Sequence, residues 1–180
     1  KGLFPTYHYG SETKLEIEYI HSVTLTGLFT TMQLGPSNMN SLFSALDTLH
    51  TCPDVPIVVT PEEIKQSYLS KLTQRISRPE YTELPNVTST YALLLSRLKK
   101  YTPTCVSVVH GDPWFANLLW TIEDRIKCVD MRGHIGNTLT LNGDPLYDYA
   151  KVYQSILGFD EVVFGLEPVD AAYRNHVFSL

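Results

Sequence analysis

The chain has 180 residues, 43% of them hydrophobic, and a formal net charge of −5 at pH 7. A chain of this length buries roughly 70% of its unfolded surface, so we expect one globular domain over residues 1–180. The acidic balance argues against a nucleic-acid surface, which needs clustered Lys and Arg, and no apolar run reaches the roughly 20 residues that span a bilayer.

The cysteines indicate a reducing compartment. Cys52, Cys105 and Cys128 are odd in number and show no CxxC spacing, so the sequence predicts neither a disulfide framework nor a zinc site. We therefore expect a cytoplasmic protein.

The first part of the chain is predicted to be a strand followed by helices. Residues 15–20 have the pattern of a strand, residues 25–32 that of a short helix or turn, and residues 38–50 that of an amphipathic helix. The apolar positions that share one face of this last helix are Met39, Leu42, Phe43, Leu46 and Leu49. That face is expected to be buried.

A second helix has a strong start signal. Thr60 is predicted to be its N-cap, with Pro61 in the first turn and Glu63 completing a capping box. The predicted buried stripe of this helix is Ile64, Tyr68, Leu69 and Leu72.

A polar connector and another helix follow. Residues 79–86 are interpreted as the connector, and residues 90–100 carry apolar positions at helical spacing, which predicts the helix.

The second half is predicted to alternate short strands with helices. Strands are expected at residues 106–109, 118–122 and 126–129, and helices at 145–157 and 169–177. The predicted fold class is α+β, mainly helical, with a small strand cluster around one loop.

That loop is the most informative segment of the sequence. In VVHGDPWFANLLW, residues 108–120, Asp112 stands five residues before Asn117. A carboxylate that accepts a hydroxyl proton and an amide oxygen that holds Mg²⁺ must converge on one small volume, and a short rigid loop leaving a strand can hold both there. The spacing is typical of phosphotransfer.

A further oxygen ligand follows downstream. The segment RIKCVD is predicted to be a strand, and it ends in Asp130. Mg²⁺ takes oxygen ligands in near-octahedral geometry and keeps several waters, so Asn117 and Asp130 with substrate phosphates would suffice.

The order of these motifs resembles the aminoglycoside phosphotransferase and choline kinase family of protein-kinase-like small-molecule kinases. The matching segments are HGDPWFAN, KCVD and GDPLYDYAKV. The resemblance implies the large C-terminal lobe of a protein-kinase-like fold, ATP and Mg²⁺ as cofactors, and a small hydroxyl compound, such as a sugar or amino-alcohol, as acceptor. The version VDMRGHIG followed by GDPLYDYAKVYQSILGFD is similar to a subgroup associated with bacterial surface-polysaccharide gene products.

The resemblance extends upstream to a hinge. It implies a hinge strand at about residues 14–20, where Glu18, Tyr19 and Ile20 present backbone groups to adenine, and a helical lobe at about 25–180. Only about 13 residues precede the hinge, too few for the sheet, glycine-rich loop and lysine of a small lobe. We expect a fragment, a processed form or one lobe of a split protein, whose missing N-terminal lobe or a partner chain covers its upper face.

The resemblance also implies individual roles. Asp112 would orient the acceptor hydroxyl and take its proton, while Asn117 and Asp130 would hold Mg²⁺ against the ATP phosphates. His110 is interpreted as an architectural member of the loop. Asp144 begins a helix, and it could cap that helix, brace the catalytic loop as the resemblance implies, or do both.

The acceptor side is less defined. Arg132 could meet a phosphate or an anionic acceptor, or it could pair with Asp144 or Asp148. Aromatic side chains near the motifs could stack on a sugar or a quaternary amine, although most are expected in the core. These residues are Trp114, Phe115, Tyr147, Tyr149 and Tyr153.

Two alternatives remain open beside the phosphotransferase. One is a truncated or degenerate kinase fold with a binding or scaffold role and no activity. The other is a metal-dependent hydrolase that uses His50, His110, Asp112 and Asp130.

Overall fold

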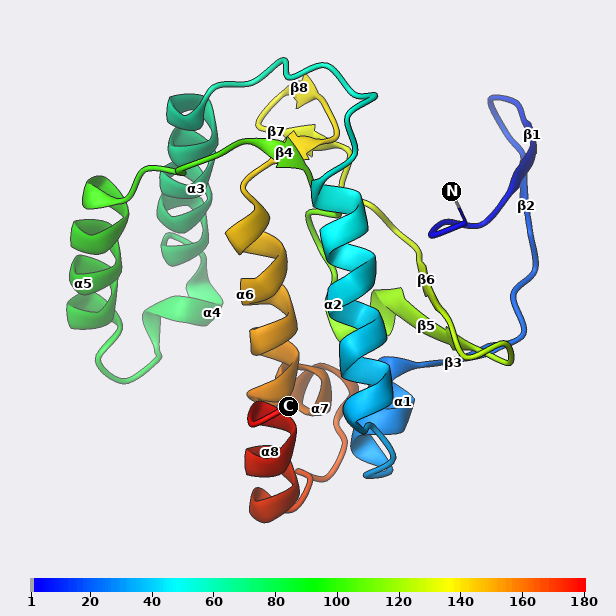
Figure 1. The fold of residues 1–180 in the computed structure, drawn as a ribbon. Helices are drawn as coiled ribbons and strands as arrows, with labels where there is room; N and C mark the ends of the chain where they lie inside the picture. The colour runs from blue at the N-terminus through cyan, green and yellow to red at the C-terminus, as the bar shows by residue number, and fades with distance from the viewer. Residues whose placement is uncertain (1) are drawn as a thin grey trace.

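Helices dominate the chain, and short strands lie between them (Figure 1). The computed structural model describes residues 2–180, with only the backbone of Thr82. The helices are α1 (Leu25–Thr30), α2 (Pro36–His50), α3 (Pro61–Ile76), α4 (Pro79–Thr82), α5 (Val87–Lys100), η1 (Phe115–Asn117), α6 (Pro145–Ile156), α7 (Phe159–Phe164) and α8 (Ala171–Phe178). In the described part of the chain, no helix is both long enough and apolar enough to cross a membrane.

The strands form four small antiparallel groups. They are β1 (Tyr7–Gly10), β2 (Leu15–Ile17), β3 (Ser22–Thr24), β4 (Ser107–Val108), β5 (Leu118–Thr121), β6 (Ile126–Cys128), β7 (His134–Ile135), β8 (Thr138–Leu139) and β9 (Asn142–Gly143). The largest group is a three-stranded sheet in the order β3-β5-β6, and the other pairs are β1-β2, β4-β9 and β7-β8. The predicted α+β, mainly helical fold class is confirmed.

The core lies between the two central helices, α2 and α6, and the three-stranded sheet. Figure 1 shows α2 and α6 side by side in the middle of the molecule, with α1, α7 and α8 at its lower end. The buried cluster takes members from α1, α2, α6, α8, η1 and the strands β5 and β6. Its residues are Leu25, Phe29, Leu34, Met39, Leu42, Ala45, Leu46, Phe115, Leu118, Ile126, Cys128, Val152, Ile156 and Val177. The loop that carries Asp112 therefore crosses the centre of the fold.

The pairing of β4 with β9 brings the start of this loop beside the start of α6. Ser107 lies opposite Gly143, and Val108 lies opposite Asn142. A Cβ atom at Gly143 would stand 2.6 Å from Cγ2 of Val109. Only glycine allows the backbone of β9 to lie so close to the Val109 side chain.

The predictions for the long helices are largely confirmed. In α2, four of the five predicted apolar positions are buried, and Phe43 packs partly buried against them. In α3, the Thr60 hydroxyl accepts from the Glu63 amide, and the Glu63 carboxylate accepts from the Thr60 amide, as the capping box requires.

The predicted stripe of α3 is wrong in one respect. Ile64 is buried, whereas Tyr68, Leu69 and Leu72 are only partly buried. The reason is that α3 packs mainly against α5, which itself has no buried residue, so this helix pair stands beside the core. Helical spacing identified the apolar face correctly but could not show what covers it.

Other boundaries differ from the predictions. The polar connector contains the short helix α4, and the next helix begins at Val87. The strand expected at residues 15–20 ends at Ile17, and a separate strand, β3, pairs with β5. The helix α7 was not predicted, because it is only six residues long and lies between left-handed Gly158 and Gly165.

The β1–β2 hairpin projects away from the rest of the molecule, on the opposite side from α3 and α5 (Figure 1). Its main side-chain anchor is Glu18, whose carboxylate accepts hydrogen bonds from the amide and hydroxyl of Thr6 and from Lys127 on β6. These bonds hold the pKa of Glu18 at about 2. One carboxylate thus joins the hairpin to the sheet.

Candidate functional site

The segment His110–Asn117, here called the Asp112 loop, runs along one face of α6. Three side chains of α6 contact it in order, namely Asp148, Lys151 and Ser155. They are spaced three and four residues apart, which places them on one side of a helix. The contacts between these three residues and the loop are here called the loop–helix seam.

Asp148 braces the beginning of the loop. Its side chain is 0% exposed, and its two oxygens accept from the backbone amides of His110 and Gly111, each at 2.8 Å. His50 Nε2, from α2, lies 2.9 Å from the same carboxylate. A buried carboxylate with three partners fixes the backbone geometry just before Asp112.

Gly111 is required at this bend. Its φ is +79°, and an added Cβ would lie 2.8 Å from Cβ of Arg132. A side chain here would be strained and would also collide with the neighbouring segment. The glycine of the HGD motif therefore lets the loop turn between α6 and Arg132.

Asp112 is flanked by two cations. Lys151 Nζ lies 2.9 Å from Asp112 Oδ1, and Arg132 Nη2 lies 3.8 Å from the same oxygen. Both cationic side chains are mostly buried, with 16% and 17% exposed, so these pairs are less screened than surface pairs. Sequence reasoning missed Lys151, although its position three residues after Asp148 was an available signal.

The far end of the loop is held by Ser155 and by Asn117. Ser155 Oγ accepts from the Phe115 amide at 2.9 Å, and Asn117 Nδ2 donates to the Asp112 carbonyl at 3.0 Å. The second bond fixes Asn117 directly against Asp112. The two residues that the spacing selected are thus brought together.

Asp130 lies in the segment that follows β6, and residues before and after it are hydrogen-bonded to the Asp112 loop. The Val129 amide donates to the Asn117 carbonyl at 3.0 Å, and the Arg132 amide donates to the His110 carbonyl at 2.9 Å. Asp130 itself is exposed and adopts a φ of 57°, a left-handed conformation that Asp tolerates. Asp130 therefore stands next to the Asp112 loop.

The donor set fits Mg²⁺. The amide nitrogen of Asn117 is used by the Asp112 carbonyl, which leaves its side-chain oxygen as a ligand, and Asp130 offers an exposed carboxylate. Two oxygen ligands, with waters and phosphates for the remaining positions, match the way proteins hold Mg²⁺.

The two histidines named for the hydrolase alternative have structural contacts. His50 is paired with Asp148 rather than pointing to Asp112. His110 is 0% exposed and its Nδ1 accepts from the Asp112 amide at 3.2 Å, while burial lowers its pKa against the opposing effect of Asp148. Within residues 2–180, no three His, Cys, Asp or Glu side chains are grouped so that they could hold a metal ion.

The expected capping role of Asp144 is confirmed, whereas its expected contact with the loop and the expected ion-pair partners of Arg132 need correction. Asp144 caps α6, accepting from the Leu146 amide at 3.1 Å, and it accepts from the Tyr101 hydroxyl at 2.5 Å; the residue that braces the loop is Asp148 instead. Arg132 pairs with Asp112, not with Asp144 or Asp148. In both cases the partner depends on how α6 is turned toward the loop, which spacing alone did not fix.

The three residues proposed for adenine lie between β2 and β3, outside both strands. The Glu18 amide donates to the Thr6 carbonyl at 2.8 Å, so this amide serves the hairpin, while Tyr19 is 81% exposed. Their role in nucleotide binding stays a prediction.

Two solved structures have a similar fold. A choline/ethanolamine kinase family protein from Mesorhizobium loti superposes with a TM-score of 0.56 at 20% identity, covering 98% of this chain and 59% of that chain. Choline kinase LicA from Streptococcus pneumoniae superposes with a TM-score of 0.51 at 18% identity, covering 99% of this chain and 56% of that chain. The fold is choline kinase-like.

The choline kinase-like fold confirms the protein-kinase-like architecture that the motif order implied. The chain spans less than two thirds of the length of both structures that it matches. No protein-family model and no curated protein matches the sequence.

Proposed function

We propose that this chain forms the part of an ATP- and Mg²⁺-dependent phosphotransferase that carries the base and the metal ligands, and that the acceptor is a hydroxyl group of a small molecule. The observation that supports this most is the bond from Asn117 to the Asp112 carbonyl in a loop braced by Asp148. It joins the proposed base and a proposed metal ligand in one rigid unit within a choline kinase-like fold.

The reaction follows from these positions. The acceptor oxygen forms a bond to the γ-phosphorus of ATP, the bond from that phosphorus to the β–γ bridging oxygen breaks, and ADP leaves. The hydroxyl proton passes to Asp112, which Lys151 and Arg132 hold in place. Asn117 and Asp130 would hold Mg²⁺, which neutralises charge on the transferring phosphoryl group when bound.

The remaining parts of the proposal concern the nucleotide. Backbone groups near Tyr19 and Ile20 would meet adenine, and an N-terminal lobe or a partner chain would cover the phosphates. We place the reaction in the cytoplasm. A second candidate function is a binding or scaffold protein with the same fold and without activity.

The test replaces the proposed base. In the full-length gene product, Asp112→Asn should reduce ADP release at least about 100-fold, because the amide cannot accept the hydroxyl proton. ADP release is measured with Mg-ATP and a panel of cationic, neutral and anionic hydroxyl compounds. Asp124→Asn is the matched control, since Asp124 is exposed and its φ of 57° also suits Asn.

Two results would count against the proposal. Full activity of Asp112→Asn would remove Asp112 as the base. Tight Mg-ATP binding without transfer to any compound of the panel would favour the scaffold instead.

A further inference from the structure

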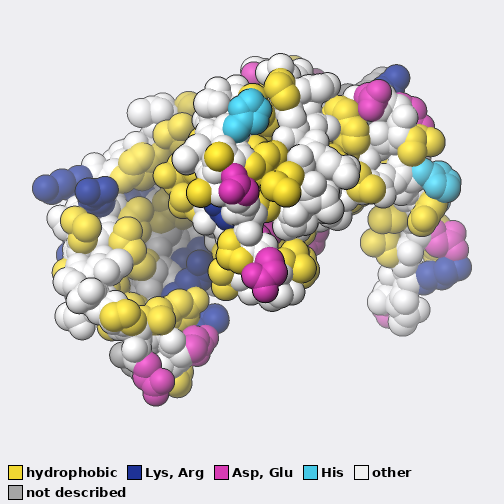
Figure 2. All heavy atoms as spheres, turned by 90° about the horizontal axis from the view of Figure 1, so that it is seen from below, with side chains coloured by type: hydrophobic (Ala, Val, Ile, Leu, Met, Phe, Trp, Pro, Cys, Tyr) yellow, Lys and Arg dark blue, Asp and Glu magenta, His cyan; other side chains and the backbone are white. Residues whose placement is uncertain are grey.

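A pocket opens between α3, α5 and α6. Its volume is about 450 Å³, which lies in the range of roughly 300–1,000 Å³ typical of small-molecule sites. Its polar and aromatic lining is Tyr68, Lys71, Arg75, Tyr101, Asp144 and Tyr147, and we call it the α3–α6 pocket. Figure 2 shows a hollow between the arm at the left and the body of the molecule, with Lys and Arg side chains inside it.

Lys71 is a buried cation without an anionic partner. Among the described residues, no group forms a hydrogen bond with its Nζ atom. Burial and the nearby charges of Arg132, Arg75 and Lys151 lower the pKa of Lys71 to about 8, and only Asp112 opposes them. A desolvated ammonium group that lacks a counter-charge is costly, so this position is suited to receive an anion.

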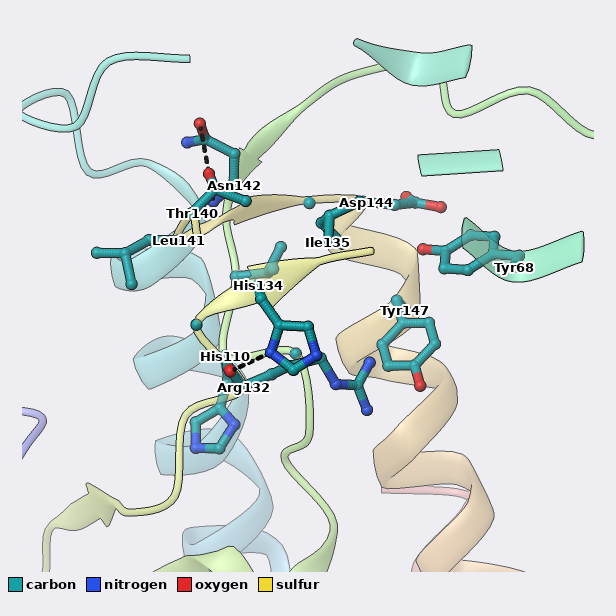
Figure 3. Close-up of a pocket in the computed structure, with 14 residues that line it drawn as sticks. Tyr68, His110, Arg132, His134, Ile135, Thr140, Leu141, Asn142, Asp144 and Tyr147 are labelled. Carbon is teal, nitrogen blue, oxygen red and sulfur yellow. Dashed lines mark hydrogen bonds between the residues drawn. The ribbon is translucent and has the colours of Figure 1, made fainter. Parts of the chain in front are cut away.

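Tyr147 connects this cation to the Asp112 loop. The Arg132 guanidinium lies 4.8 Å from the centre of the Tyr147 ring, and Lys71 Nζ lies 5.9 Å from it. Figure 3 shows Arg132 beside Tyr147, with Tyr68 and Asp144 nearby. Arg132 lies behind the pocket wall rather than in it, but it contacts both the Tyr147 ring and the Asp112 carboxylate, and so it links the pocket to the proposed active site.

The charge around the pocket is positive in a chain that is acidic as a whole. Lys71, Arg75 and Asp144 line the pocket, and the charges of Arg132, Lys151 and Asp112 act on Lys71 from beside it. Four cations thus stand against two carboxylates. Asp144 already accepts from the Tyr101 hydroxyl and from the α6 backbone. The surplus of cations favours an anion at this position.

The same contacts disfavour a quaternary amine. Three aromatic rings line the pocket, and two of them are engaged with each other, since Tyr68 stacks on Tyr147 with ring centres 5.4 Å apart, while the hydroxyl of the third, Tyr101, donates to Asp144. The Tyr147 ring already has Arg132 over it and Lys71 nearby, so a cationic ligand that stacked there would meet like charge.

We propose that the α3–α6 pocket binds the anionic part, a phosphate or a carboxylate, of the hydroxyl compound that is phosphorylated at Asp112. This inference rests on the proposed function and names its substrate class. Arg132 and Lys71 pair with the anionic group, and the pocket holds the acceptor so that its hydroxyl meets Asp112. The pocket lies on the opposite side of the molecule from the β1–β2 hairpin, where the nucleotide hinge is predicted (Figure 1).

The first experiment measures anion binding apart from phosphate transfer. Inorganic phosphate is titrated into the full-length gene product at low salt and pH 8.5 by calorimetry, in two buffers of different ionisation enthalpy. Binding should be accompanied by proton uptake, because an anion raises the pKa of Lys71 from about 8. Lys71→Met should weaken binding about tenfold or more and abolish the proton uptake.

The matched control is Lys99→Met, which removes the same charge from an exposed position in the last turn of α5. It should bind phosphate as the unmodified protein does. Undetectable phosphate binding, or equal binding by Lys71→Met, would overturn the proposal.

The second experiment compares small hydroxyl acceptors of negative, zero and positive charge. With Mg-ATP, the Asp112-dependent kcat/KM for glycerol 3-phosphate or glycerate should exceed that for glycerol and for choline at least about tenfold. Lys71→Met should raise KM for the anionic acceptor more than it lowers kcat. The two anionic compounds separate a phosphate site from a carboxylate site.

The outcomes distinguish this inference from the proposed function. Asp112-dependent transfer to choline or glycerol in preference to both anions would overturn the proposal of an anionic acceptor. It would leave the proposed phosphotransferase function standing. Phosphate binding that needs Lys71, with no transfer to any acceptor, would support the anion site and count against the phosphotransferase.

Discussion

At the loop–helix seam, Asp148 is 0% exposed and meets two backbone amides and a histidine, whereas on the β1–β2 hairpin the side chains of Tyr7, Tyr9, Leu15 and Ile17 are between 49% and 66% exposed. The seam belongs to the packed centre of the molecule. The hairpin is joined to it at its base, through Glu18, whose partners are Thr6 and Lys127, and through the Leu3 and Phe4 carbonyls, which accept from β6.

This difference separates two ways of positioning functional residues. A buried polar network has one favourable arrangement, because every group left without a partner is costly. The hairpin itself is exposed, although the segment before it is bonded to β6 through the Leu3 and Phe4 carbonyls, so the tip can move without exposing the core. We therefore expect substitutions at the seam to change global stability and substitutions on the hairpin to act locally.

The largest expected effect is at Asp148. Asp148→Ala would leave two buried amides without an acceptor and His50 without its partner, and should lower the free energy of unfolding by about 3 kcal/mol or more. Urea unfolding measures this, with the exposed turn residue Asp54→Ala as control. A loss below about 1 kcal/mol would show that the seam does not depend on this carboxylate.

A smaller effect is expected where β9 meets the start of the loop. Gly143→Ala places a methyl group 2.6 Å from Val109 Cγ2. The resulting overpacking should lower the free energy of unfolding by about 1–3 kcal/mol, which a lower thermal midpoint would show. Gly27→Ala is the control, because Gly27 is in α1 and its nearest atom would be at 3.5 Å. Its thermal midpoint should be unchanged or higher, since alanine favours a helix. Equal destabilisation by both variants would contradict the close approach.

The smallest and most local effect concerns Glu18. Its pKa is lowered from 4.5 to about 2 by the hydrogen bonds from Thr6 and Lys127, so the anchor is fully present above pH 4.5 and is lost as the pH falls through about 2. The amide resonance of Thr6 should shift in this pH window. In Glu18→Gln this shift should be absent. A titration of Thr6 that persists in the variant would assign the response to another group.

The sequence predicted those elements whose signals are local. The capping box at Thr60, the apolar face of α2 and the start of α6 after Asp144 depend on residues a few positions apart. The motif order likewise brought Asp112 and Asn117 together, because five residues in one short loop cannot lie far apart.

The partners of those elements were not predictable in the same way. Asp148, Lys151 and Ser155 share a face of α6, but only the packing of the whole fold decides that this face meets the Asp112 loop. The apolar stripe of α3 shows the same limit, since Tyr68 and Leu72 line a pocket instead of the core. Amphipathic spacing reports polarity, not the identity of the neighbour.

The dependence of the seam on one helix also bears on motion. Because Asp148, Lys151 and Ser155 all belong to α6, a tilt or shift of this helix would carry His110, Asp112 and Phe115 with it as a rigid body. The internal shape of the loop would then survive opening and closing movements elsewhere in the protein. Hinge motion is expected in segments such as residues 18–21, outside β2 and β3, while the proposed base keeps its orientation.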